Sequence, residues 1–401
     1  MKETMPVTPY YVIKEEALAG EYNTLSSNLQ KYWGNVIVGY SFKTNSLPWL
    51  ISFMKERGAY AEVVSHDEYL LAKYMGYKDS EIIYNGPYKD RESFRNILLA
   101  GGYLNMDSRY ELAWLKELSE EYPDRNFKVG IRVNFDLERM CPGETTMKEE
   151  SGRFGFCYET GVFADVLQQI QKLSNVKVNG LHLHSSSKSR SVKIFESIAK
   201  MAVQLKKEFD LSVEYVDMGG GYCGGIKGRP TYDDYIPAIT KVLKNEFRPE
   251  ETKLIVEPGI SLISSAFTFV TKVLDVRDIK GSRYLITDGS RFNVDTTMIK
   301  TSYFYHVEYE GDKIRDNMKL QHVTGFTCME ADRLFKIENL PELKVGDRIV
   351  YENVGGYTMS LNPLFIQYFP DAYVEKEGHL TLVRKKWGPE QYVQNCCLKA
   401  E

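Results

Sequence analysis

The feature that most constrains the fold is a regular alternation between short apolar runs and longer stretches of helical period, which begins at residue 35. We count eight runs rich in β-branched and aromatic residues, at residues 35–43, 59–65, 81–86, 103–107, 127–134, 178–184, 212–219 and 253–259. Such alternation indicates parallel strands joined by crossover helices. Eight strand-helix units favour a closed (β/α)8 barrel, whereas a doubly wound open sheet would need fewer strands.

The texture of the chain changes after residue 265. Long alternating runs separated by turn-rich loops follow, at residues 266–276, 282–290, 301–310, 348–358 and 379–386. They predict an antiparallel β-sandwich or small barrel, which the strand-like N-terminal segment TPYYVI could join. We therefore expect an α/β protein with a cofactor-binding barrel at residues 25–265 and a C-terminal antiparallel β-domain made of residues 1–24 and 266–401.

Charge and composition narrow the range of partners. The chain carries 51 Lys and Arg against 55 Asp and Glu, so it has no overall field to hold a nucleic acid or an anionic membrane. It has no apolar run of bilayer or signal-peptide length, and we expect a cytoplasmic protein with a small-molecule partner. The six cysteines show no CxxC spacing, so we expect no metal site.

In a parallel barrel the reactive face lies at the carboxyl ends of the strands. Lys43 ends the first run, His184 the sixth and Glu257 the eighth, while Gly219–Gly221 end the seventh. Each has an ordinary explanation when taken singly: a solvated lysine, a core histidine, a turn-forming glutamate and a flexible glycine turn. Their joint occurrence at the strand ends favours a shared site.

Strand alternation predicts which side chains face the barrel interior. Residues two apart on a strand share a face, so His182 and His184 would point inward while the leucines between them face the helices. By the same alternation Lys43 shares a face with Gly39 and Ser41, whose small side chains leave room for a ligand.

Together these residues match what pyridoxal phosphate requires of a protein. The cofactor needs a lysine for a Schiff base, a glycine-rich cradle for its phosphate, a carboxylate for its ring nitrogen and an aromatic plate against its ring. Lys43, Gly219–Gly221, Glu257 and His184 would take these roles in turn, and Tyr357 would donate its hydroxyl to the phosphate.

The motifs YSFKTN, GLHLHSSS, VDMGGGYCGG, VEPG, GFTCMEAD and GGYTMS resemble those of the fold-type III pyridoxal phosphate-dependent decarboxylases of ornithine, arginine and diaminopimelate. The likeness covers nearly the whole chain, and Ile260 departs from it where that family has an arginine. The resemblance implies a head-to-tail homodimer with shared active sites, in which Cys328 is the catalytic proton donor in trans. It also implies these cofactor-binding residues: Lys43, Arg132, His184, Ser187, Gly219, Gly220, Gly221, Glu257, Gly259 and Tyr357.

The expected reaction is α-decarboxylation of an amino acid or amino-acid conjugate, through a Schiff base on Lys43 and a quinonoid intermediate. Pathways that make polyamines, lysine or siderophores are the expected settings. Glu330 and Asp332 would bind a cationic distal group of the substrate, or else belong to a solvated acidic loop. Two other functions stay open: an amino-acid racemase on the same fold, and a catalytically inactive regulatory homologue.

Overall fold

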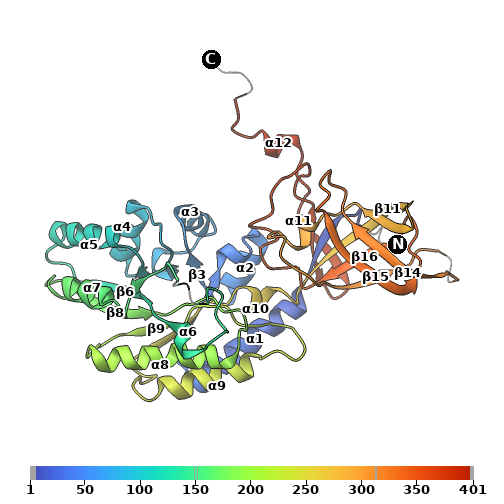
Figure 1. Ribbon diagram of the computed structural model, residues 1–401. Coiled ribbons are helices and arrows are strands. Elements are labelled where there is room, and N and C mark those ends of the chain that lie inside the picture. Colours follow the sequence, from blue (N-terminus) through green and yellow to red (C-terminus); the bar gives the residue numbers. More distant parts are fainter. Residues whose placement is uncertain (1–5, 149, 151, 312–313, 398–401) are drawn as a thin grey trace. The chain divides into compact units, whose positions relative to one another are not determined.

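The computed structural model (Figure 1) describes residues 6–148, 150, 152–311 and 314–397. The chain divides into two compact units, residues 21–261 and residues 1–20 with 262–401. The domain boundaries expected after residues 24 and 265 stay a prediction. No helix in the described ranges is long and apolar enough to cross a membrane.

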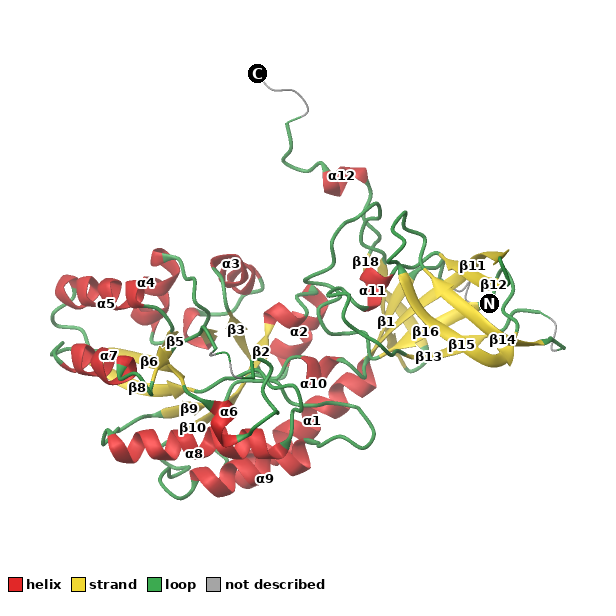
Figure 2. Cartoon of the chain, viewed as in Figure 1, coloured by secondary structure: helices red, strands yellow, loops and turns green. Residues whose placement is uncertain are grey.

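In residues 21–261, eight parallel strands close into a barrel surrounded by helices (Figure 2). Around the barrel they follow the order β2 (Val36–Ser41), β3 (Tyr60–Val63), β4 (Ile82–Tyr84), β5 (Tyr103–Met106), β6 (Phe127–Asn134), β8 (Val176–His182), β9 (Tyr215–Asp217) and β10 (Lys253–Val256). Pairing of β10 with β2 closes the ring, and the two-residue β7 (Phe156–Cys157) adds to β6 outside it. The predicted barrel is thereby confirmed, and the open sheet is excluded.

Helices join the strands, as the sequence pattern predicts. They are α1 (Glu15–Tyr32), α2 (Pro48–Glu56), α3 (His66–Tyr74), α4 (Arg91–Ala100), α5 (Arg109–Glu121), α6 (Leu137–Met140), α7 (Val162–Gln171), α8 (Val192–Glu208), α9 (Tyr232–Leu243) and α10 (Ile260–Ile263), with 3-10 turns η1 (Phe42–Thr44) and η2 (Asp79–Glu81). Helix α8 is representative: Ser191 accepts a hydrogen bond from Ile194 N at its start, and Ile194, Ile198 and Leu205 form part of its buried stripe.

One tyrosine fills much of the barrel interior. Tyr215 on β9 belongs to a core cluster with Ile37, Ile83 and Ile255 from three other strands. The chain makes room for its ring by omitting side chains on neighbouring strands: a Cβ built at Gly180 would lie 1.9 Å from the Tyr215 Cζ. The ring therefore needs glycine at that position.

We expect Gly180→Ala to destabilise the barrel by about 3 kcal/mol, because the added methyl overlaps a ring that has no room to move in a closed core. Denaturant unfolding of the purified variant measures the loss. Gly20→Ala is the matched control, since a Cβ at that helical position would meet no atom within 4 Å apart from its chain neighbours and the nearby backbone of its own helix. Equal stability of Gly180→Ala and the wild type would contradict the packing described here.

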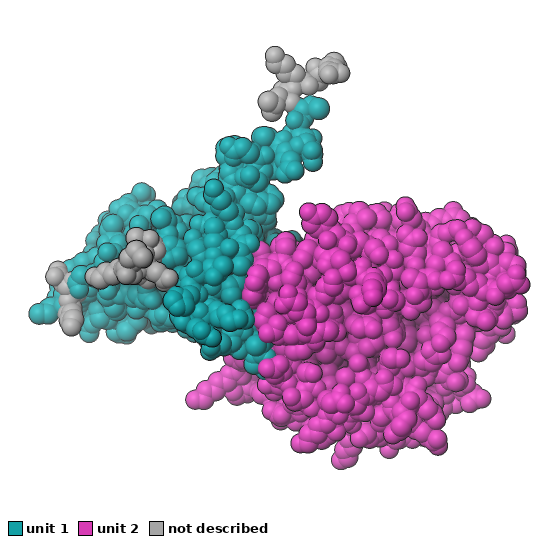
Figure 3. All heavy atoms as spheres, turned by 180° about the vertical axis from the view of Figure 1, so that it is seen from behind, with its two compact units in different colours: residues 1–20, 262–401 teal, residues 21–261 magenta. Residues whose placement is uncertain are grey.

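The other unit, teal in Figure 3, is a mainly antiparallel β-structure. Its strands are β1 (Tyr10–Lys14), β11 (Phe267–Ile279), β12 (Ser282–Thr287), β13 (Phe304–Glu308), β14 (Asn317–Thr324), β15 (Arg333–Pro341), β16 (Arg348–Glu352), β17 (Asp371–Lys376) and β18 (His379–Arg384), with short helices α11 (Arg291–Val294) and α12 (Pro389–Tyr392). The N-terminal strand β1 joins this sheet between β11 and β17, as predicted. The sheet is mixed, because β1 pairs with β17, and β12 with β14, in parallel.

Candidate functional site

Lys43 lies just after β2 and is paired with a buried carboxylate. The strand ends at Ser41, so Lys43 stands in the turn η1 and not on the strand face that alternation predicted. Its Nζ lies 2.7 Å from Oε2 of Glu62 on β3, which is 1% exposed, and the Ser41 hydroxyl donates to the same oxygen. Burial alone would lower the pKa of Lys43, but the charges of Glu62 and Glu257 outweigh it and raise the pKa. The amine is therefore held as a cation by its contact with Glu62, and the charge of Glu257 acts in the same direction.

Glu257 follows β10 and is held ionised. Burial would raise its pKa, but the neighbouring His182, a hydrogen bond from Asp217 and the charge of Lys43 bring the pKa well below its usual range. The pKa of Asp217 is raised well above its ordinary value by burial and by the charge of Glu257. Within this pair Asp217 carries the proton and Glu257 the charge. The side-chain amide of Asn85 also donates to Glu257.

Among the described residues, His182, Asp217 and Glu257 form a group whose ligand-type atoms lie within 4.8 Å of one another. The His182 Nε2 is 3.6 Å from the Glu257 Oε2, and all three side chains are buried. His182 and Asp217 thus lie beside the ionised Glu257. The expectation of no metal site stays a prediction, and we derive no metal chemistry from these residues.

His184 follows β8 and packs against the glycine-rich loop. A Cβ at Gly219 would lie 2.5 Å from the His184 Nδ1, and the Gly220 N–H points at the same nitrogen from 3.3 Å. Gly219 has φ +64, which glycine adopts without strain. Burial, followed by the positive charge of Arg132, lowers the pKa of His184 to about 3. The imidazole is therefore neutral at physiological pH.

This lowered pKa predicts a loss of stability in acid. The unfolded chain protonates His184 near its ordinary pKa of about 6.5, whereas the folded chain does so only at about 3. As pH falls through that window, the unfolded state binds a proton that the folded state does not, so the folded state loses stability. We expect His184→Asn to lose less stability than wild type between pH 7 and pH 5, measured by denaturant unfolding of cofactor-free protein. Identical pH dependence in both would contradict the neutral imidazole.

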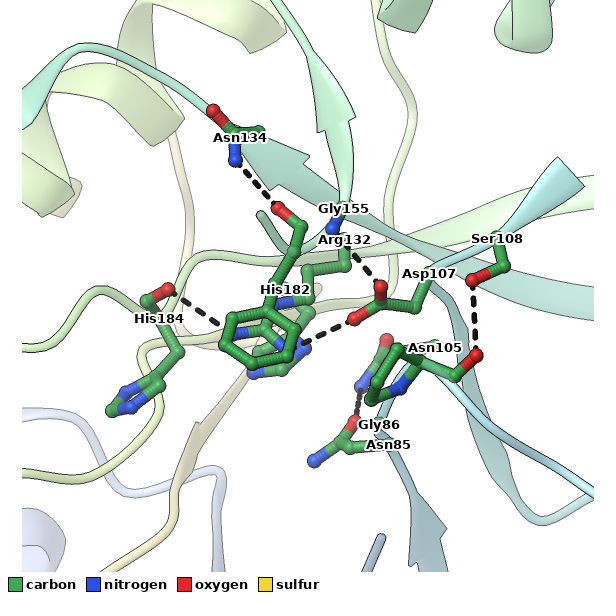
Figure 4. A network of polar contacts seen from close by, with 12 residues as sticks. Asn85, Gly86, Asn105, Asp107, Ser108, Arg132, Asn134, Gly155, His182 and His184 are labelled. Atoms are coloured by element: carbon green, nitrogen blue, oxygen red, sulfur yellow. Dashed lines mark hydrogen bonds and ion pairs between the residues drawn. The ribbon is translucent and has the colours of Figure 1, made fainter. Parts of the chain in front are cut away.

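Arg132 on β6 is fixed by Asp107, which follows β5. Its Nη1 donates to Asp107 Oδ2 at 2.9 Å, and the other Asp107 oxygen accepts from Gly155 N at 3.0 Å (Figure 4). The Arg132 Nη2 points at the main-chain oxygen of His184 from 3.5 Å. Arg132 and His184 both line a cavity of about 690 Å³, whose other walls come mainly from residues 133–160. This volume lies within the range of about 300–1,000 Å³ that small-molecule sites occupy.

Three more predicted residues lie in the barrel unit. A Cβ at Gly259 would lie 2.2 Å from the Thr44 Oγ1, so glycine allows the VEPG segment to pack against the turn that carries Lys43. The Ser187 hydroxyl accepts a hydrogen bond from Arg190 N at 2.9 Å. Gly221, the last of the three loop glycines, has φ +96.

The remaining predicted residues lie in the β-unit, and they are Cys328, Glu330, Asp332 and Tyr357. That they form one site with Lys43 stays a prediction. Cys328 is exposed, and Glu330 forms an exposed ion pair with Arg333. The Asp332 carboxylate is buried and accepts hydrogen bonds from Arg291 N and from the Thr327 hydroxyl. Asp332 thus fixes the loop that carries Cys328. Tyr357 has φ +65, an uncommon conformation for a residue with a side chain.

Sequence reasoning missed the partners that connect these groups. Glu62 is the single charged residue in the apolar run AYAEVVS, and Asp217 and Asn105 lie within strands. In the sequence all three resemble ordinary strand residues. A charged or amide residue inside a barrel strand is the signal that could have identified them, because such groups are buried only when paired.

The barrel residues fit pyridoxal phosphate. They offer an amine paired with a buried carboxylate, an ionised buried carboxylate for a protonated ring nitrogen, and a neutral flat ring beside a glycine loop. The buried Nε of Arg132 has no hydrogen-bond partner among the described residues, as expected of a side chain placed for a ligand.

Comparison with known proteins gives consistent results. Residues 20–264 match the family model described as pyridoxal-dependent decarboxylase, pyridoxal binding domain. The diaminopimelate decarboxylase of Methanocaldococcus jannaschii is 25% identical over 88% of this chain and 83% of the relative. The L-glutamyl-[BtrI acyl-carrier protein] decarboxylase of Niallia circulans is 25% identical over 94% of this chain and 91% of the relative. A crystal structure of the M. jannaschii diaminopimelate decarboxylase has the same fold, with a TM-score of 0.85, 23% identity, and coverage of 98% of this chain and 92% of that one.

Proposed function

This chain belongs to the family of pyridoxal-dependent decarboxylases, and from that premise we propose that it removes the α-carboxyl group of an amino acid or amino-acid conjugate with pyridoxal 5'-phosphate held on Lys43. The observation that carries the proposal is the buried connection between Lys43 and Glu257. Glu62 accepts from Lys43, and Asn85 donates to both Glu62 and Glu257. One network thus holds the amine that binds the cofactor and the carboxylate that its ring nitrogen needs.

When bound, pyridoxal phosphate supplies an electron sink for the electron pair that remains when the bond from the α-carbon to the carboxylate breaks. Glu257 holds a proton at the ring nitrogen, because an ionised carboxylate is a strong acceptor in a buried site. His184 would face the ring and is neutral, so it would add no charge that competes with the ring nitrogen. Ser187, Gly219–Gly221, Gly259 and Tyr357 surround the phosphate in this proposal.

The cavity beside Arg132 and His184 is the proposed place for the substrate side chain. Arg139 and Arg153 line it and are exposed, and four acidic residues line it as well, Asp136, Glu138, Glu150 and Glu159. A polar distal group of either charge can therefore be bound there. One similar protein is a diaminopimelate decarboxylase, and another decarboxylates a glutamyl group carried by an acyl-carrier protein, which supports testing both amino acids and their conjugates as substrates. Binding of a cationic distal group by Glu330 and Asp332 is the alternative.

A head-to-tail homodimer completes the proposed site. Cys328 from the partner subunit would protonate the α-carbon after carbon dioxide leaves, and its exposure in this chain is compatible with that role. Measurement of the molar mass in solution, with a Cys328→Ser variant assayed for amine formation, tests this part of the proposal.

The decisive assay measures carbon dioxide release by the cofactor-loaded protein from lysine, ornithine, arginine, diaminopimelate, carboxynorspermidine, acylated diamino acids and glutamyl conjugates. We expect one of these to give carbon dioxide and amine in equal amounts. Chiral analysis of the same reactions covers the alternative: inversion of a substrate without carbon dioxide release would identify a racemase. A protein that takes up no cofactor would be an inactive homologue.

A further inference from the structure

We propose that Asn85 is a positioning residue that ties Glu62 to Glu257 and so sets the electrostatic surroundings of the bond between Lys43 and the cofactor. This inference rests on the proposed function, because it takes Lys43 as the residue that binds pyridoxal phosphate. Asn85 follows β4 and is 2% exposed.

The amide of Asn85 has only one possible orientation. Its Nδ2 lies 3.1 Å from Glu62 Oε1 and also donates to Glu257 Oε1. An ionised carboxylate accepts hydrogen bonds and cannot donate them, so the NH2 end must face the two glutamates. One amide group therefore satisfies an oxygen on each of two buried carboxylates.

The opposite end of the amide is fixed by a chain of hydrogen bonds through the barrel interior. The Asn85 Oδ1 accepts from Asn105 Nδ2 at 2.9 Å (Figure 4), and the Asn105 Oδ1 accepts from the Tyr215 hydroxyl at 2.8 Å. Tyr215 thus donates to Asn105, Asn105 donates to Asn85, and Asn85 donates to the two glutamates. Rotation of Asn85 would break three bonds at once, so the glutamates keep a fixed spacing.

The charge on Lys43 depends on these two carboxylates. Both raise the pKa of Lys43, against the effect of burial. A hydrogen-bond donor stabilises the charged form of a buried carboxylate, so loss of the amide would make the charge of Glu257 less stable. Less negative charge would then face Lys43. Among the described residues, the titratable groups around this cluster include Lys43, Glu62, Glu68, His182, His184, Tyr215, Asp217, Tyr222 and Glu257.

Glu68 is the neighbour that needs separate attention. Burial and then the charge of Glu62 raise its pKa to about 7, and its carboxylate accepts from Val64 N. It has no hydrogen bond to Asn85. Because the charge of Glu62 acts on Glu68, the comparison between variants described below is repeated in a Glu68→Gln background, which removes the titration of Glu68.

The test follows the visible absorbance of the cofactor bound to Lys43 as pH is varied, in wild type, Asn85→Leu and Asn85→Asp. We expect Asn85→Leu, which keeps similar volume without donors, to lower the apparent pKa of the linkage by about one unit. Asn85→Asp adds a third carboxyl group and should raise it. Asn35→Leu is the control. Asn35 precedes β2 and donates a side-chain hydrogen bond to the main-chain oxygen of Pro249, so this variant loses one hydrogen bond outside the cluster and should show the wild-type apparent pKa.

A purely structural role for Asn85 would lower stability in both variants without shifting the titration in opposite directions. The inference would be overturned if both Asn85 variants, with cofactor bound, showed the same apparent pKa of the linkage as wild type. If Asn85→Leu fails to fold, the upward shift in the closely matched Asn85→Asp still decides it. Absence of the lysine-bound absorbance in wild type would instead overturn the proposed function, so the two failures are distinguishable.

Discussion

Lys43→Ala is expected to lower decarboxylation by at least about a thousandfold and to remove the lysine-bound absorbance of the cofactor. The reason is geometric as well as chemical. Among the described barrel residues, only Lys43 contributes an amine to the hydrogen-bond network that contains Glu257. Without it the cofactor has no covalent attachment, and no group replaces the amine during release of the product. Carbon dioxide release and absorbance spectra, recorded on the same preparation, measure both effects.

Lys31→Ala is the matched control for Lys43→Ala. Lys31 is an exposed residue at the end of α1, so its loss should leave activity and absorbance unchanged. Retention of the lysine-bound absorbance by Lys43→Ala would show that another amine holds the cofactor.

Glu257→Gln is expected to lower kcat by about a hundredfold to a thousandfold while the cofactor stays bound. Glutamine keeps the shape but carries no charge, so it cannot hold a proton at the ring nitrogen. The negative charge of Glu257 is stabilised in this site, because His182, Asp217 and Lys43 all lower the pKa of Glu257 despite its burial. The variant therefore loses the group that draws electrons into the ring, and steady-state kinetics with spectra of the bound cofactor measure the loss.

The matched control for Glu257 is Glu214→Gln, which changes a carboxylate paired with Lys128 near the start of β9. We expect its kcat to equal that of wild type. An unchanged kcat in Glu257→Gln would mean that the ring nitrogen does not depend on this carboxylate.

Much of the fold could be predicted from sequence because of how parallel strands are buried. Strands covered on both sides appear as short apolar runs, and all eight barrel strands fall within or overlap the predicted runs. Strands β14, β15 and β17 were missed. They alternate between exposed and buried positions and contain many charged or amide side chains, as in NMKLQHVT, so their sequences do not differ clearly from loops.

The candidate site could be predicted in part. Lys43, His184 and Glu257 lie just after the ends of barrel strands, and that rule selected all three as candidates. Strand alternation failed for Lys43, because β2 gives way to a 3-10 turn after Ser41. The connecting residue Asn85 was visible at a strand end, but its two carboxylate partners are 23 and 172 residues away in the chain. Local pattern carries no information on such pairings.

The most direct measurement of the central claim is chemical trapping of the cofactor in the wild-type protein. Borohydride reduction of the loaded protein, followed by digestion and mass spectrometry, should place the pyridoxyl group on the peptide that contains Lys43 and on no other. A label on another lysine, such as the buried Lys89 that pairs with Glu111, would contradict the account, as would a protein that carries no label.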